Sequence, residues 1–276
     1  MATKKKVKET NKDYLEIYSY LLKSLKEIKE DEEMPEQLKD WADFFLINLS
    51  EDSQSEYVIY TMASSVTMCA KYEPLPKKVG DVVKRIYGYF IKLNDDGAMC
   101  DLGSFYYNGY FGKPDYRNAL KYYRMSSALG NPIADENLGY IYYYGRDVKI
   151  DYKKAYHHFI KGYIRGLYAS SYKIGDMYKN GYYVGKDEEI AFDIYFELLN
   201  RLPEPEESYI FERPDVYVRV ADCLNRGIGV EKNTKEALKY ARNAKKLFKE
   251  RVDNGDKTAM VGLDWAQEII EANKKK

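Results

Sequence analysis

Residues 98–109 read AMCDLGSFYYNG, residues 134–145 read ADENLGYIYYYG, and residues 170–181 read SSYKIGDMYKNG. These three stretches are copies of one pattern, because corresponding residues are 36 positions apart from each copy to the next. A fixed period of roughly 20 to 50 residues is typical of a solenoid, in which successive copies stack on one another. The repeat therefore predicts the fold before any other feature of the chain is considered.

Each copy contains two amphipathic helices. In the first copy, apolar residues recur at helical spacing on one face of a first helix: Ala98, Leu102, Phe105 and Tyr106. Gly109 then ends this helix, and Asp115 begins the next by accepting hydrogen bonds from its free amide groups. The second helix has an apolar face of its own: Ala119, Tyr122, Tyr123 and Ser126. Since neither helix can bury its face alone, the pattern predicts an all-α fold, an α/α right-handed superhelical solenoid of antiparallel helix pairs.

Small residues within the helices are as informative as the large ones. Gly103 and Ala119 let the two helices of a pair approach closely, while Leu102 and Tyr106 fill the space beside them. Gly139 takes the place of Gly103 in the second copy. We expect Gly139 to tolerate nothing larger than alanine, because a longer side chain would push the helices apart.

These residues resemble the Sel-one-like repeat, a relative of the tetratricopeptide repeat. The family pattern is A-x-x-x-L-G-x-x-Y-x-x-G, a short turn, and then D-x-x-x-A with two aromatic residues and a closing glycine. Residues 98–130 match it almost completely, and residues 134–166 match it with His158 in an aromatic position. The third copy departs mildly, at Ser170, Ile174 and Leu202. The resemblance implies a helical array that binds proteins.

The sequence before the three copies is predicted to be helical. Three helices are expected in it. The first covers residues 11–28, the second has Pro35 in its first turn, and the third covers residues 53–72. When the repeat pattern is aligned 36 positions earlier, residues 61–96 keep some of its small and large apolar residues but none of its glycines. That segment is therefore either a degenerate repeat or an unrelated helical cap, and residues 1–60 form an N-terminal helical cap.

The pattern resumes after the three copies at residues 97–202. Residues 214–256 align with the third copy at an offset of 46 instead of 36, so ten residues are inserted, and the segment 203–213 is the candidate. Such insertions form loops on one face of a solenoid and are often functional, although a solvated loop of tolerated length explains the segment equally simply. The last residues, 257–276, are predicted to form a C-terminal capping helix.

Composition excludes several classes of partner. The 276 residues include 44 basic and 44 acidic side chains, so no net charge favours nucleic acid or an anionic membrane. No apolar run approaches the roughly 20 residues of a membrane span, and no secretory signal follows the basic start. The three cysteines are isolated and odd in number, which fits a reducing cytoplasm better than a disulfide framework. We therefore expect a cytoplasmic protein.

No residues are marked out for catalysis, cofactor binding or metal binding. His157 and His158 are adjacent on a helix, so their side chains diverge by about 100° and do not suit a shared metal. The glycines at 181 and 185 belong to a repeat turn, because the spacing and the residue after Lys186 do not match a phosphate-binding loop. The sequence predicts a non-enzymatic scaffold or adaptor that binds a protein or peptide. Two alternatives remain open: a hydrolase-type enzyme of the resembled family, and an exported effector that acts by binding protein.

The candidate binding residues are the exposed positions of the first helix in each copy, which the resemblance places on the concave side of the array. They precede the Leu-Gly pair and the turn glycine, and are seven positions apart on one face of the helix: Asp101, Asn137, Lys173 and Arg219, then Asn108, Tyr144, Asn180 and Arg226. Asparagine amides could hold the backbone of an extended partner, and Tyr144 could supply an apolar anchor. The alternative is that these side chains are simply solvated.

Several of the 30 tyrosines lie outside the expected core positions: Tyr107, Tyr110, Tyr143, Tyr144, Tyr182 and Tyr183. Such residues are either anchors on a binding surface or contacts that bridge neighbouring repeats, and the sequence does not distinguish the two.

Overall fold

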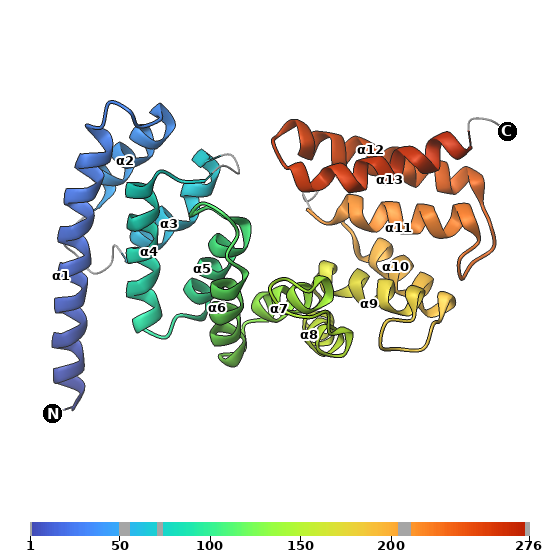
Figure 1. Ribbon diagram of the computed structural model, residues 1–276, viewed down its shortest axis with the longest axis horizontal. Helices are drawn as coiled ribbons and strands as arrows, with labels where there is room; N and C mark the ends of the chain where they lie inside the picture. The colour runs from blue at the N-terminus through green and yellow to red at the C-terminus, as the bar shows by residue number, and fades with distance from the viewer. Residues whose placement is uncertain (1, 50–55, 71–73, 204–210, 274–276) are drawn as a thin grey trace. The chain divides into compact units, whose positions relative to one another are not determined.

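The computed structural model describes residues 2–49, 56–70, 74–203 and 211–273. Nearly all of them lie in helices, which Figure 1 labels: α1 (Ala2–Lys29), α2 (Glu36–Asn48), α3 (Glu56–Ala70), α4 (Lys77–Lys92), α5 (Asp96–Asn108), α6 (Tyr116–Ala128), α7 (Pro132–Tyr144), α8 (Tyr152–Ile164), α9 (Tyr168–Asn180), α10 (Glu188–Arg201), α11 (Arg213–Arg226), α12 (Thr234–Asp253), the 3-10 helix η2 (Lys257–Ala259) and α13 (Met260–Ala272). No strand occurs within these ranges. The prediction of an all-α array of helix pairs is confirmed.

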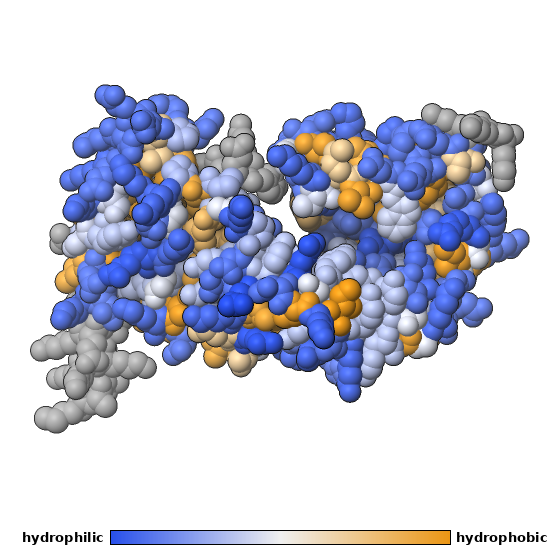
Figure 2. Space-filling model, viewed as in Figure 1, coloured by the Kyte–Doolittle hydropathy of each residue, from blue (hydrophilic) through white to orange (hydrophobic). Residues whose placement is uncertain are grey.

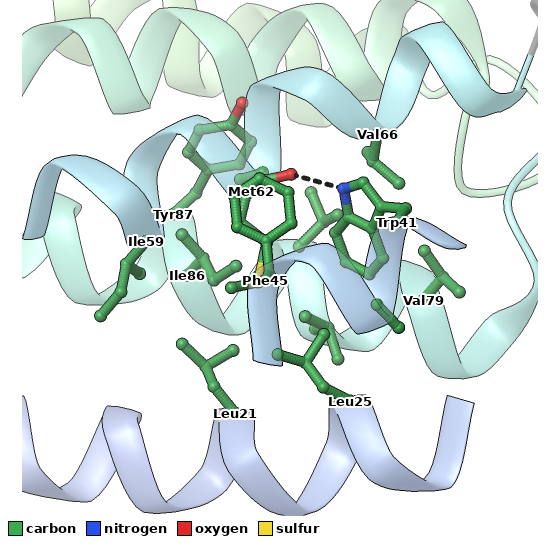
Figure 3. Close-up of a cluster of buried hydrophobic side chains, with 14 of the residues drawn as sticks. Leu21, Leu25, Trp41, Phe45, Ile59, Met62, Val66, Val79, Ile86 and Tyr87 are labelled. Atoms are coloured by element: carbon green, nitrogen blue, oxygen red, sulfur yellow. Dashed lines mark hydrogen bonds between the residues drawn. The ribbon is translucent and has the colours of Figure 1, made fainter. Parts of the chain in front are cut away.

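The chain divides into two compact units, Met1–Ala134 and Asp135–Lys276. The first unit contains α1 to α6, and its core is a single cluster of apolar side chains. Figure 3 shows Leu21 and Leu25 of α1 facing Trp41 and Phe45 of α2. The indole Nε1 of Trp41 donates a hydrogen bond of 3.3 Å to the backbone oxygen of Met62, so the one polar atom of this ring is satisfied inside the core.

The N-terminal helices differ from the prediction at their ends. Helix α1 begins at Ala2 rather than near residue 11, since the lysine-rich start contains no residue that stops a helix. Pro35 is the N-cap of α2 and precedes its first turn instead of lying within it. Helix α3 runs from Glu56 to Ala70, and the predicted ends at 53 and 72 lie outside the described residues.

Helix ends within the repeats have the geometry that the sequence predicts. The carboxylate of Asp115 accepts a hydrogen bond from the amide of Asn118 at 3.0 Å, and the corresponding residues of later copies do the same: Asp151, Asp187 and Asn233. Gly109 closes α5 with φ of 75°, a conformation that costs glycine little and other residues more. Each copy is therefore a helix, a tight turn and a second helix.

The close approach of the two helices in a copy is tighter than the sequence indicates. A Cβ atom on Gly103 would lie 2.7 Å from the ring of Tyr123, and one on Gly139 would lie 2.5 Å from the ring of Phe159. Gly175 faces Tyr195 in the same way, also at 2.5 Å. The expectation that Gly139 tolerates nothing larger than alanine agrees with this contact, and the limit is stricter, because the fully buried Phe159 ring already occupies the space that even a methyl group would need.

The second unit consists of stacked helix pairs. Each helix from α8 to α13 packs on the next one along the chain, and α11 also contacts α13. Helices α11, α12 and α13 lie side by side in Figure 1. The last pair repeats the close approach of the other copies, because a Cβ on Gly262 would lie 2.3 Å from the ring of Phe248. This contact seals the C-terminal end of the buried core.

Most of the inserted segment 203–213 lies outside the described residues, which resume at Phe211. Its two ends are joined directly, since the Arg213 guanidinium donates a hydrogen bond of 2.8 Å to the backbone oxygen of Pro203. The insertion therefore leaves and re-enters the array at one point. Within the described ranges, no helix has the length and apolarity that crossing a lipid bilayer requires.

Candidate functional site

A groove of about 680 Å³ lies in the second unit. Its lining comes mostly from the first helix of successive pairs. In Figure 2 the surface between α9 and α13 is hollowed, with hydrophilic residues in the hollow and hydrophobic ones over the start of α13. Most of the side chains that line it are charged or aromatic: Glu136, Tyr140, Tyr144 and Arg146 from α7 and its turn, Tyr172 and Lys173 from α9, Phe211, Glu212, Asp215 and Arg219 around α11, Phe248 and Arg251 from α12, and Trp265 from α13. Small or aliphatic residues and one threonine complete the lining: Ala169, Val218, Thr258, Ala259, Val261 and Gly262.

The base of the groove is held by a buried ion network around Asp176. Arg219 binds this carboxylate in bidentate fashion, with Nε and Nη2 each 2.8 Å from a different oxygen. Lys173 donates to the same carboxylate at 3.2 Å and to the Tyr144 hydroxyl at 2.9 Å, and the Tyr195 hydroxyl donates to Asp176 at 2.8 Å. With four hydrogen bonds, the Asp176 carboxylate is fully used.

Charge decides the ionisation of Asp176. Burial alone would raise its pKa, but the charges of Arg219 and Lys173 outweigh burial and hold the pKa well below its usual range. Asp176 is therefore ionised at neutral pH. Moving either cation away from it would leave a buried charge without its partner, which is costly. The network fixes the positions of side chains on α9 and α11.

A second ion network fixes the rim of the groove. Arg251 donates two hydrogen bonds to Asp256, at 2.7 and 2.9 Å, and a third to Asp215 at 3.2 Å. The guanidinium also lies 3.7 Å from the centre of the Phe211 ring. Burial raises the pKa of Asp215, although Arg219 and Arg251 oppose that shift. The two networks meet at Asp215 and tie α9, α11 and α12 together.

Aromatic rings form the wall between these charges. The Tyr140 and Tyr144 rings are nearly parallel, 6.1 Å apart, and the hydroxyls of Tyr140 and Tyr172 are joined by a hydrogen bond of 3.1 Å. The Arg219 guanidinium lies 4.0 Å from the centre of the Tyr172 ring and 5.7 Å from that of Trp265. Since rings and ions hold one another, the wall is rigid, which favours binding.

Comparison with known proteins identifies the array. A model of the Sel1 repeat family matches four segments, residues 97–131, 132–167, 169–196 and 214–247. The chain is a member of the Sel1 repeat family. The second, third and fourth Sel1 repeats supply groove residues, together with Phe211 and Glu212 just before the fourth repeat and with the end of α12, η2 and α13 after it.

Solved structures of Sel1 repeat proteins share this fold. A Sel1 repeat protein from Oxalobacter formigenes aligns with a TM-score of 0.56 and 17% identity over 78% of this chain and 87% of that one. A protective antigen of uropathogenic Escherichia coli strains, described as having an SLR fold, aligns with a TM-score of 0.51 and 21% identity over 91% of this chain and 56% of that one. A search of curated proteins finds no significant match.

Three of the eight candidate residues, Tyr144, Lys173 and Arg219, line the Sel1 groove together. Asp101 and Asn108 lie in the first unit, where Asp101 accepts a hydrogen bond of 2.8 Å from the Tyr60 hydroxyl. The other three, Asn137, Asn180 and Arg226, are not part of the lining.

Contacts within their own helices explain why Asn108, Asn180 and Arg226, unlike Tyr144, do not line the groove. The Asn108 and Asn180 amides bond backwards to the backbone oxygen four residues earlier, at 3.0 and 2.7 Å. Arg226 lies 3.6 Å from Asp222 on its own helix. These side chains therefore serve the last turn of their own helices, although a partner could still contact their exposed parts.

Two groove residues that the sequence did not single out, Glu136 and Tyr172, lie one position before the predicted Asn137 and Lys173. Glu136 precedes Asn137, and its counterpart in the next Sel1 repeat is Tyr172, 36 positions later. Tyr140 and Asp176 are related by the same step. The period therefore contained the signal, but only the structure shows which neighbouring position of α7 and α9 faces the groove.

The tyrosines outside the core positions have different roles. Tyr110 is buried in the first unit and packs on Phe105 of its own repeat at 5.1 Å. Tyr143 packs on Tyr182 of the next repeat at 6.0 Å, so these two rings bridge copies. Tyr182 stacks on Tyr152 at 4.3 Å. Tyr144 alone among these six tyrosines lines the groove, and it is 46% exposed.

The two histidines do not form a common site. The His158 ring stacks on Tyr142, and its Nδ1 lies 2.9 Å from Asp135, whereas His157 bonds to the backbone of Lys153. Burial lowers the pKa of His158, although Asp135 opposes the shift. No cluster of three or more histidine, cysteine, aspartate or glutamate side chains suited to a metal occurs in the described part of the chain.

Proposed function

We propose that this Sel1 repeat protein is a non-enzymatic scaffold or adaptor that holds an extended segment of a partner protein in the groove of the second unit. The observation that carries the proposal is the groove itself, which one helix from each successive pair lines with exposed ring edges and fixed ions. A preformed surface of this kind binds without a large cost for ordering side chains. Membership of a family of protein-binding arrays supports the same function.

The contacts of the ionisable residues favour binding over turnover. Lys173 and Arg219 are tied to Asp176, and Arg251 is tied to Asp215 and Asp256. Such pairs hold side chains in place but leave no strong base beside a nucleophile among them. We also propose a cytoplasmic location, which the buried thiol of Cys223, a cysteine outside any disulfide, supports.

Site-specific photo-crosslinking tests the groove as the binding surface. A photoreactive phenylalanine analogue replaces Tyr144, which lines the groove, or Ile164, which is 73% exposed at the end of α8 and is not part of the lining. After irradiation in native lysate, we expect covalent capture of a protein from position 144 and none from position 164. Capture from position 164 alone would contradict the proposal.

A further inference from the structure

Three of the four basic side chains that line the groove are bound to carboxylates of the same unit, and the fourth, Arg146, lies 5.6 Å from the centre of the Tyr144 ring. Arg219 and Lys173 bind Asp176, and Arg251 binds Asp256 and Asp215. An acidic partner would have to compete with these buried pairs. Because separating a buried pair is costly, Lys173, Arg219 and Arg251 do not make this groove a site for anions.

Two carboxylates of the lining are not neutralised in this way. Glu136 is engaged through one oxygen only, Oε2, which accepts hydrogen bonds of 2.7 Å from both the amide and the hydroxyl of Ser170. Glu212 is half-buried just before α11, and no cation lies within ion-pair distance of either carboxylate in the described ranges. Glu136 and Glu212 therefore supply the negative charge that a ligand can meet.

Electrostatics of the pair agree with this placement. Burial raises the pKa of Glu136, and the nearby charge of Glu212 raises it further. A positive group between the two carboxylates would relieve both effects. The charges of the groove and its two buried aspartates also leave an excess of one carboxylate, because four cations (Arg146, Lys173, Arg219, Arg251) face five anions (Glu136, Asp176, Glu212, Asp215, Asp256).

The aromatic surface beside these carboxylates suits the stem of a long basic side chain. Tyr140 and Tyr172 both line the groove, and their hydroxyls bond to each other. Tyr172 is buried and the Arg219 guanidinium lies 4.0 Å from its ring centre, so the half-buried Tyr140 ring is the aromatic surface beside Glu136 that a ligand can reach. Lysine and arginine pack their apolar stems on such rings while their charged ends reach a carboxylate. Charge and shape therefore favour the same kind of occupant.

We propose that the partner segment places a lysine or arginine side chain on the Tyr140 ring, with its charge between Glu136 and Glu212. This rests on the proposed function, since it names the chemistry that the groove selects in a peptide. The partner is thus a protein with an extended basic segment. Lys173 and Arg219 position the wall and do not bind the partner's charge.

A blocked-terminus heptapeptide library tests the inference on the full chain. Random heptapeptides with acetylated amino ends and amidated carboxyl ends carry charge only on their side chains. Selection on the wild-type protein should enrich lysine or arginine at one position. The dissociation constant of the best peptide, measured by fluorescence polarisation, should rise about tenfold in E136Q/E212Q, which corresponds to about 1.4 kcal/mol. Glu189→Gln makes the same chemical change on the exposed surface of α10 and should leave affinity unchanged.

Folding does not obscure the outcome. Glutamine retains the oxygen that accepts the Ser170 bonds, and Glu212→Gln alone, at a side chain with no hydrogen bond among the described residues, repeats the test if the double variant is unstable. Enrichment of acidic residues, or unchanged affinity in E136Q/E212Q, overturns the inference. Tyr172→Ala separates the two proposals. Peptides that lose binding in Tyr172→Ala but not in E136Q/E212Q support the groove without a basic partner, whereas peptides insensitive to both contradict the proposed function as well.

Discussion

Gly139→Ala is the sharpest test of how the helices of a Sel1 repeat pack in this chain. The added Cβ would lie 2.5 Å from Cε1 and 2.6 Å from Cδ1 of Phe159, well inside van der Waals contact. Phe159 is fully buried and cannot move aside. Overpacking of this kind costs about 1–3 kcal/mol, more than the helix propensity that alanine gains over glycine. We expect a loss of about 2 kcal/mol, which lowers the melting temperature by roughly 4–8 °C in a chain of this size.

Gly88→Ala is the matched control, because it makes the same change in the middle of α4. A Cβ at Gly88 meets no heavy atom within 4 Å. Only helix propensity then changes, so this variant should be as stable as the wild type or more stable by up to about 1 kcal/mol. The two substitutions therefore have opposite expected signs for one chemical change.

Circular dichroism at 222 nm measures both variants during thermal and urea unfolding. Phe159→Leu provides a further check, because a smaller side chain beneath residue 139 should reduce the cost of the added methyl group in a double-mutant cycle. The fourth repeat already contains this combination. Ala221 stands at the glycine position and Ala241 stands at the position of the facing ring, and both are fully buried. If Gly139→Ala proves as stable as Gly88→Ala, the proposed packing is refuted.

Three further predictions follow from the buried polar groups. Asp176→Asn should destabilise the protein by about 3–5 kcal/mol, since Arg219 loses its buried counter-ion. Because the pKa of Asp176 is lower in the folded than in the unfolded state, the ionised carboxylate stabilises the protein above the unfolded pKa of about 3.9, and this stabilisation is lost as the pH falls. The free energies of unfolding of wild type and Asp176→Asn, measured by urea titration, should therefore converge in acid. Burial raises the pKa of the Cys223 thiol to about 12, so a thiol reagent at pH 8 should label it only as the protein unfolds, and rapid labelling of the native chain would show that this core is open. Burial lowers the pKa of His158, so NMR titration should find it below the usual 6.5 or so and below that of a denatured sample, whereas a higher value would mean that Asp135 dominates.

The sequence by itself determined the repeating unit. The step of 36 residues aligned Asp115 with Asp151, and both cap the second helix of their copy in the structure. It also identified Gly103 and Gly139 as points of close approach. These features are local, since a cap or a turn depends on residues within a few positions of each other, and repetition makes each signal visible several times.

The groove was determined only in part, because the predicted face was one position away from the lining residues Glu136 and Tyr172. A helix rotates by about 100° per residue, so the period specifies which positions are equivalent but not which of two neighbours faces inward. That orientation depends on how each pair packs on the next, and three of the expected residues nevertheless line the groove.

Tertiary structure alone decided which charges are available. Asp176 and Arg219 are 43 residues apart and on either side of the insertion, yet they form the bidentate pair at the base of the groove. From the sequence alone, Lys173 and Arg219 are two basic residues at helix positions that the repeat pattern predicts to be exposed. Whether a charge meets solvent, a partner or a buried counter-ion depends on distances of a few ångströms between helices, because ion-pair energy and the cost of desolvation both change steeply over that range.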